Sequence, residues 1–159
     1  MLNVCLIGVG RLKERWEKEA CAEMSKRLSR FCSLEICEIP DQPEPDALND
    51  ASIAQVTRRE GEEILARLKP RDRVIALCID GKSYTSEAFA ERLGDWSMDG
   101  RRLVLVIGGS LGLGENVIRR ADEKLSFSKF TFPHRLMRVI LLEQLYRGFK
   151  INAHERYHK

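Results

Sequence analysis

The sequence lacks any hydrophobic run long enough to cross a membrane. A spanning helix needs about 20 apolar residues, and the opening apolar run extends only from Leu2 to Val9. No basic segment precedes this run, and Arg11-Leu12-Lys13-Glu14 follows it where a secretory signal would have small residues for cleavage. We therefore interpret the run as a strand and expect a cytoplasmic protein without membrane association.

The sequence also lacks the cysteine spacing of a metal site. Its five cysteines form no Cys-x-x-Cys pair and no Cys/His cluster with zinc spacing, so we expect no bound metal. Cys5, Cys37 and Cys78 lie in apolar runs, where a reduced thiol behaves as a small buried hydrophobic group. These features predict free core thiols in a reducing compartment.

Charge is unevenly distributed along the chain. The net charge is only +3, but residues 119–159 contain 10 Lys+Arg against 4 Asp+Glu, whereas residues 1–118 contain 17 against 20. A local positive surplus of this kind attracts a polyanion through counterion release. An ordinary solvated surface would give the same counts, so the surplus alone leaves both interpretations open.

Hydrophobic periodicity predicts alternating strands and helices within one domain, residues 1–159. The predicted strands cover 2–9, 33–39, 73–80 and 103–107, with a short strand or extended loop at 126–132. The predicted helices cover about 12–31, 52–68, 85–96 with Thr85 as N-cap, 115–124 and 134–149. Residues 40–46 are Pro-rich and acidic and predict a loop. This alternation favours an α/β fold with a mainly parallel sheet and helices on both faces.

Glycines at 108–114 directly follow the apolar run Leu103 to Ile107. Glycines at the end of a buried strand let backbone amides approach a ligand closely. The loop is not a Walker motif, because Gly114-Glu115-Asn116 stands where Gly-Lys-Ser/Thr is required. A dinucleotide fingerprint would follow the first strand, where Gly8-Val9-Gly10 lacks the third glycine and indicates a turn. A glycine-rich connection without a ligand remains the alternative.

Three predicted strand ends are candidates for a shared pocket. Ligands of open parallel sheets bind beyond the carboxyl ends of the strands. The segments that meet this condition are 77–80, 107–109 and 127–132.

A second group of candidate residues begins at Pro133, which suits a first helical turn. His134 follows at the helix N-terminus, where the dipole disfavours its protonated form. Arg135 and Arg138 are three residues apart and can share a helix face that grips a phosphate or a base, or they can simply be solvated. Glu143 and Arg147, at i and i+4, most simply form a helix ion pair.

The chain ends in Tyr157-His158-Lys159, which could stack on a base and contact phosphate, or could be a frayed terminus. Together with this ending, three segments occur in an order that resembles the RlmH family of pseudouridine N3-methyltransferases acting on large-subunit ribosomal RNA. They are residues 7–13, 105–113 and 125–134, followed by Arg138-Val139 and 143–147. The resemblance covers essentially the whole chain.

The resemblance implies a SPOUT methyltransferase fold with a trefoil knot in the C-terminal half, and a homodimer with its pocket near the subunit interface. It implies S-adenosylmethionine as cofactor and ribosomal RNA in the assembled ribosome as partner. The residues it places around the cofactor are Leu77, Gly108, Gly109, Phe127, Ser128, Lys129, Phe130, Thr131 and Phe132. Its candidates for catalysis or RNA binding are His134, Arg138, Tyr157 and His158. The tail lacks the Gly often found just before Tyr-His in this family.

The implied reaction is an in-line displacement in which the base N3 attacks the sulfonium methyl group. N3 must lose a proton, and the possible bases are His134, His158 and Glu143, while Arg138 could stabilise a developing oxyanion. Two alternatives stay open at this point. One is a non-catalytic ribosome-binding module of the same fold, and the other is a nucleotide-binding enzyme that uses residues 108–114 for phosphate.

Overall fold

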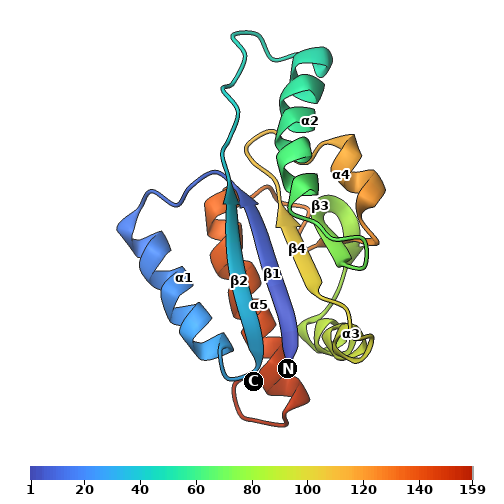
Figure 1. The fold of residues 1–159 in the computed structure, drawn as a ribbon. Coiled ribbons are helices and arrows are strands. Elements are labelled where there is room, and N and C mark those ends of the chain that lie inside the picture. The colour runs from blue at the N-terminus through green and yellow to red at the C-terminus, as the bar shows by residue number, and fades with distance from the viewer. Residues whose placement is uncertain (159) are drawn as a thin grey trace.

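The chain folds around a five-stranded sheet in the order β2-β1-β4-β3-β5, and every neighbouring pair of strands is parallel (Figure 1). The structure, a computed structural model, describes residues 1–158. The strands are β1 (Leu2–Val9), β2 (Cys32–Ile39), β3 (Arg73–Ser83), β4 (Leu103–Ile107) and β5 (Glu123–Ser126). The helices are α1 (Arg15–Leu28), α2 (Asp50–Ala66), α3 (Ser86–Met98), α4 (Glu115–Arg120) and α5 (His134–Asn152). The predicted parallel α/β architecture is confirmed.

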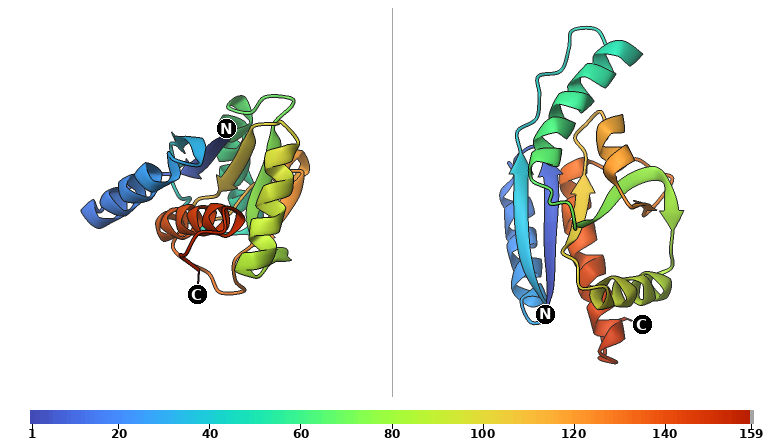
Figure 2. Two further views of the ribbon diagram at one scale, coloured as in Figure 1. Left: turned by 90° about the horizontal axis from the view of Figure 1, so that it is seen from below. Right: turned by 45° about the vertical axis from the view of Figure 1, so that its right-hand side comes forward.

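Each face of the sheet has its own apolar core. In β1, Val4 and Leu6 point into the core shared with α1, α3 and α5, whereas Cys5 and Ile7 point into the core shared with α2 and α4. Figures 1 and 2 show α5 on the opposite side of the sheet from α2. Successive side chains of a strand point to opposite faces of the sheet. Because both faces are covered here, the buried positions on either side of the strand are apolar, which explains the continuous apolar run in the sequence.

The predicted bounds of most helices and strands lie within a few residues of the observed ones. Thr85 is the N-cap of α3, and its Oγ1 accepts a hydrogen bond from Ala88 N at 3.1 Å. One prediction in the C-terminal half is wrong. The helix expected to reach Lys124 ends at Arg120, and β5 begins at Glu123, among residues assigned to that helix. Of the two alternatives for 126–132, a short strand or an extended loop, the loop is confirmed, because β5 ends at Ser126 and residues 127–133 form no regular element.

Strand β5 pairs with β3 at two separate places. Leu125 is the partner of Leu77 and again of Lys82, with residues 78–81 between the two pairings. β3 therefore bends between these two pairings, and the bent green strand is visible in the right-hand view of Figure 2. Gly81 lies at the closest approach, since a Cβ there would stand 2.7 Å from the backbone N and C atoms of Leu125.

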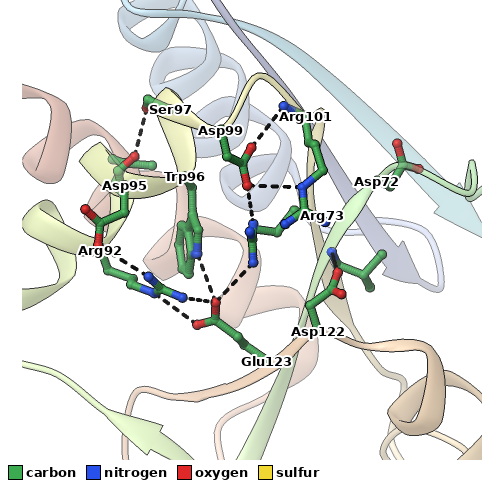
Figure 3. A network of polar contacts seen from close by, with 12 residues as sticks. Asp72, Arg73, Arg92, Asp95, Trp96, Ser97, Asp99, Arg101, Asp122 and Glu123 are labelled. Atoms are coloured by element: carbon green, nitrogen blue, oxygen red, sulfur yellow. Dashed lines mark hydrogen bonds and ion pairs between the residues drawn. The ribbon is translucent and has the colours of Figure 1, made fainter.

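A polar network fixes the beginning of β5 against α3 and β3 (Figure 3). The Glu123 carboxylate accepts hydrogen bonds from both Nε and Nη2 of Arg92, and from Trp96 Nε1 at 3.2 Å. Arg73 Nη1 approaches the same carboxylate at 3.5 Å and bonds Asp99 through its Nε. Burial raises the pKa of Glu123, but the bonds from Arg92 and Trp96 outweigh this effect and leave the pKa below its ordinary value. The charged form of Glu123 thus holds three elements together.

The structure bears on three expectations from composition, namely the free thiols, the positive surplus of residues 119–159 and the lack of a membrane-spanning run. All five cysteines are free thiols; Cys5, Cys21 and Cys32 are buried, and Cys37 and Cys78 are half-buried. Part of the positive surplus of 119–159 is matched by carboxylates earlier in the chain, through the ion pairs Arg119–Glu115, Lys124–Asp80 and Arg138–Glu38. Among residues 1–158, no helix is both long and apolar enough to span a bilayer.

The close approach of Gly81 to β5 predicts opposite effects for two glycine substitutions. Gly81→Ala should lower the free energy of unfolding by roughly 1–3 kcal/mol, because the new methyl group overlaps backbone that has no room to move. Gly94→Ala in α3, whose Cβ would meet only Asn152 Nδ2 at 3.7 Å, should raise it by about 0.5–1 kcal/mol. Equilibrium urea unfolding measures both, and equal stability of the two variants would contradict the double pairing.

Candidate active site

A cavity of about 380 Å³ opens at the carboxyl ends of β3, β4 and β5. This volume falls in the range of about 300–1,000 Å³ that small-molecule pockets occupy. Its walls are formed by the three segments predicted from the sequence, 77–80, 107–109 and 127–132, together with the start of α5. The lining residues that carry the argument are Leu77, Gly108, Phe127, Phe132, His134 and Met137. The prediction of a shared pocket at these strand ends is therefore confirmed.

The glycines of 108–114 have separate structural roles. Gly109 and Gly112 close a turn, with Gly112 N donating to Gly109 O at 3.1 Å and Gly112 at a φ of +84°. Gly108 leaves room for this turn, since a Cβ there would stand 2.7 Å from the carbonyl of Gly112. Gly114 lets α4 approach α2, where a Cβ would meet Thr57 O at 2.6 Å. Gly108, Gly109 and Gly112 line the pocket and present backbone rather than side chains to it.

The segment 127–132 forms the outer wall of the pocket. Ser128 holds its shape, because Ser128 O accepts from Ser126 Oγ and Ser128 Oγ accepts from Phe130 N, both at 3.0 Å. Phe127 packs edge-on against Phe89 at 6.3 Å between ring centroids. All the predicted cofactor-binding residues line the cavity except Lys129, which is exposed.

His134 is the predicted catalytic residue that the structure brings to the pocket. It is the first residue of α5 and is half-buried. Burial lowers the pKa of its imidazole, and the cationic side chains of Arg135 and Arg138 lower it further. The direction agrees with the sequence-based expectation, although burial contributes more than any other cause. A neutral imidazole at the pocket can accept a proton at neutral pH.

Arg138 is buried and does not line the pocket. Its side chain is only 1% exposed, and Nη1 pairs with Glu38 at 2.7 Å while Nη2 donates to the carbonyl oxygens of Val9 and Gly10. Gly8 provides the space, since a Cβ there would lie 2.8 Å from the Arg138 Cζ. Nε is the buried side-chain polar atom of residues 1–158 that has no hydrogen-bond partner.

The sequence-based alternatives for Arg138, a phosphate grip or a solvated charge, did not anticipate this burial. Its partner Glu38 lies 100 residues away in the sequence. No local signal in the helix pointed to that partner. The glycine at position 8, read as part of a turn, was the one available hint, because it lies inside β1 and makes room for the guanidinium.

Tyr157 and His158 follow the end of α5, bond back to side chains on it and do not line the cavity. Tyr157 Oη donates to Glu143 Oε1 at 3.1 Å, and its ring packs edge-on against Tyr146. His158 bonds Arg147 and, at 2.7 Å, Glu87. Glu143 is nine residues beyond His134, or roughly 14 Å along a helix axis. Lys159 lies outside the described residues.

The expected ion pair between Glu143 and Arg147 is present. Glu143 therefore already accepts from Arg147 and Tyr157, and it is distant from the cavity.

Comparison with known proteins decides the family. A family model described as "Predicted SPOUT methyltransferase" matches residues 2–158. The chain belongs to the SPOUT methyltransferase family. Ribosomal RNA large subunit methyltransferase H of Bifidobacterium animalis is 51% identical over 159 residues, and that of Clostridium novyi is 52% identical; each match covers 99% of this chain and 100% of the relative. The resemblance to the RlmH family is thereby confirmed.

Solved structures support the fold of this methyltransferase. A methylase family protein from Haemophilus influenzae matches with a TM-score of 0.58 at 12% identity, covering 99% of this chain and 71% of that one. The TrmH/SpoU tRNA modifying enzyme of A. aeolicus matches with a TM-score of 0.53, also at 12% identity, covering 96% and 78%. At such low identity these matches show the SPOUT fold alone.

The Arg138–Glu38 pair predicts a stability effect that depends on pH. Burial raises the pKa of Glu38, but hydrogen bonds from Arg138 and Leu12 N outweigh this and leave it lowered from 4.5. Glu38→Gln should therefore lower the free energy of unfolding at pH 7 by roughly 1–3 kcal/mol, less than for a fully buried pair because Glu38 is 38% exposed.

The sign of the pH dependence follows from the lowered pKa. The stabilisation by Glu38 is present above about pH 4.5 and is lost as the pH falls through the lower folded-state value. Unfolding of Glu38→Gln and the unaltered protein from pH 7 to pH 3 measures it, with the exposed Glu91→Gln as control. A gap that stays constant over this range would refute the ion pair.

Proposed function

We propose that this methyltransferase transfers a methyl group from S-adenosylmethionine to N3 of a pseudouridine in large-subunit ribosomal RNA, on the assembled ribosome. The observation that carries the proposal is the likeness of the whole chain, about half of it identical, to ribosomal RNA large subunit methyltransferases H. The cavity at the carboxyl edge of a parallel sheet adds a site of suitable size and position. The cavity alone would also suit a nucleotide, so the likeness to these methyltransferases is what favours the proposal over the nucleotide-binding alternative.

The residues of the cavity fit the cofactor. Leu77, Leu125 and Phe127 offer apolar walls to an adenine ring, and the loop at Gly108 and Gly109 offers backbone groups unobstructed by side chains. S-adenosylmethionine also occupies a solved SPOUT-like methyltransferase of Legionella pneumophila, which matches this fold with a TM-score of 0.50 at 12% identity. When bound, the cofactor supplies an activated methyl group on a sulfonium centre.

The protein's own task is to position the base and to take up its proton. His134 lines the cavity with a neutral imidazole, and we propose it as the group that receives the N3 proton. Arg138 is a positioning residue in this scheme, because its guanidinium is bonded to Glu38 and to the carbonyls of Val9 and Gly10. It holds the end of β1 against the first turn of α5.

We propose a homodimer with the pocket near its interface. Phe130 at the pocket mouth is 79% exposed and Phe132 is 37% exposed, which gives an apolar surface for a second copy to cover. Tyr157 and His158 bond to α5 and α3 away from their own chain's cavity. A role for them in catalysis or RNA binding requires a rearranged tail or the cavity of the second copy.

We also propose that the whole chain is one SPOUT domain whose C-terminal half forms a trefoil knot. The two pairings of Leu125, with Leu77 and with Lys82 of the bent β3, support this proposal, because they place β5 against both sides of the bend. The reaction is assigned to the cytoplasm, where ribosomes are found.

The direct test is transfer of labelled methyl from S-adenosylmethionine to assembled ribosomes that lack the modification, followed by nucleoside analysis. We expect label in N3-methylpseudouridine of the large-subunit RNA. No incorporation, while a control methyltransferase modifies the same ribosomes, would favour a non-catalytic ribosome-binding module instead.

The lowered pKa of His134 predicts the pH dependence of the rate. Because the neutral imidazole accepts the proton, kcat should be constant near neutral pH and should fall as the pH drops below 6.5 through the lowered pKa. His134→Asn should reduce kcat by roughly 10²–10⁴-fold and abolish this acid limb. Single-turnover rates from pH 5 to pH 8 measure it, and an unchanged acid limb in the variant would rule out His134 as the proton acceptor.

A further inference from the structure

The β1–α1 loop (residues 10–14) and the first turns of α1 carry an exposed aromatic side chain. Trp16 is 52% exposed, whereas the other tryptophan, Trp96, is 2% exposed and bonded to Glu123. The aromatic and cation–π pairs found among residues 1–158 do not include Trp16. Its indole face is available to a partner.

Cations flank this tryptophan in the sequence. Within residues 1–158, the exposed cations of the segment that form no ion pair are Arg11, Lys13 and Lys18. Residues 10–19 carry four cations against three carboxylates, a net charge of +1, and the carboxylates differ in their exposure and partners. Glu17 is buried and accepts a hydrogen bond from Glu14 N, and Glu19 pairs with Arg15 at 2.7 Å. Glu14 is then the one exposed carboxylate of residues 10–19 without an ion pair in the described chain.

The segment is fixed beside the pocket. Arg135 Nε donates to Arg11 O at 2.9 Å, and Arg138 donates to Gly10 O. His134 lies close as well, since a Cβ on Gly10 would stand 3.5 Å from its Nε2. The first turn of α5, which lines the cavity, therefore holds the loop that leads to Trp16.

We propose that Trp16 stacks on an unpaired base of the substrate RNA while Arg11 and Lys13 contact the flanking phosphates. Aromatic faces bordered by Arg and Lys are the chemistry by which proteins grip single-stranded or looped RNA. Trp and Arg are also common at protein–protein interfaces, but lysine is depleted there, so Lys13 favours RNA over a protein partner. The inference rests on the proposed function and names the part of the surface that recognises RNA outside the cofactor cavity.

The stacking is tested by steady-state methyl transfer to ribosomes. Trp16→Ala should raise KM for ribosomes roughly 5- to 100-fold, the range for loss of one base-stacking contact, and should change the Kd for S-adenosylhomocysteine less than about twofold. Trp16→Phe keeps an aromatic face and should recover most of the loss. Met98→Ala, which removes a side chain that is 87% exposed on α3, is the matched control and should leave KM unchanged.

The phosphate contacts are tested by salt dependence. Arg11→Glu and Lys13→Glu should each weaken ribosome binding and reduce the slope of log Kd against log salt concentration by about 1. Arg71→Glu is the control, because Arg71 is exposed just before β3 begins, at the opposite edge of the sheet from the pocket. An equal effect of Arg71→Glu would show a general charge effect and would overturn the assignment.

The outcomes separate this inference from the proposed function. Methyl transfer by the unaltered protein with no change in Trp16→Ala would overturn the stacking alone. No methyl transfer by the unaltered protein would refute the proposed function, and sedimentation with ribosomes would then decide the inference: weaker binding of Trp16→Ala supports it, and equal binding overturns it. A smaller molar mass of Trp16→Ala by light scattering would overturn it in favour of a contact between subunits.

Discussion

The double pairing of β5 with β3 is the constraint on which the rest of the structure depends. Because Leu125 pairs with both Leu77 and Lys82, β3 must bend around β5, and Gly81 supplies the space for that approach. The bend brings residues 77–80 to one side of the cavity, and β5 leads into 127–132 on the other. The ion pairs of Glu123 hold the same strand against α3. The cavity thus depends on the pairing of two strands distant in the sequence rather than on one local motif.

A second interaction, the ion pair of Arg138 with Glu38, connects the start of α5 beside the cavity to strands β1 and β2. Burying a guanidinium is costly unless its charge and donors are matched, and Arg138 is matched by Glu38 and by carbonyls at the end of β1. The pair ties the first turn of α5 to β1 and β2, and with it His134 and the loop at Arg11. An arginine that does not contact the reacting atoms can therefore affect both the proton acceptor and the surface proposed to hold RNA.

Local patterns predicted what depends on near neighbours. The strand Leu103–Ile107 and the N-cap Thr85 follow from a continuous apolar run and a hydroxyl at a helix start. The strand at 123–126 was missed because it is short, begins with two charged residues and owes its existence to pairing with a distant strand. The burial of Arg138 was missed for a similar reason, since Glu38 and Gly8 are far away in the sequence. The residues predicted to bind the cofactor came from the family resemblance, and the position of the strand ends predicted that they share one cavity.

The central claim is that the cavity bounded by β3, β4 and β5 is the cofactor site. A crystal structure of the protein with S-adenosylhomocysteine tests it most directly. The account predicts density for the adenine between Leu77, Gly108 and Phe127, with the sulfur directed toward the side of the cavity where His134 lies. Density at any other surface, with this cavity filled only by solvent, would contradict the account.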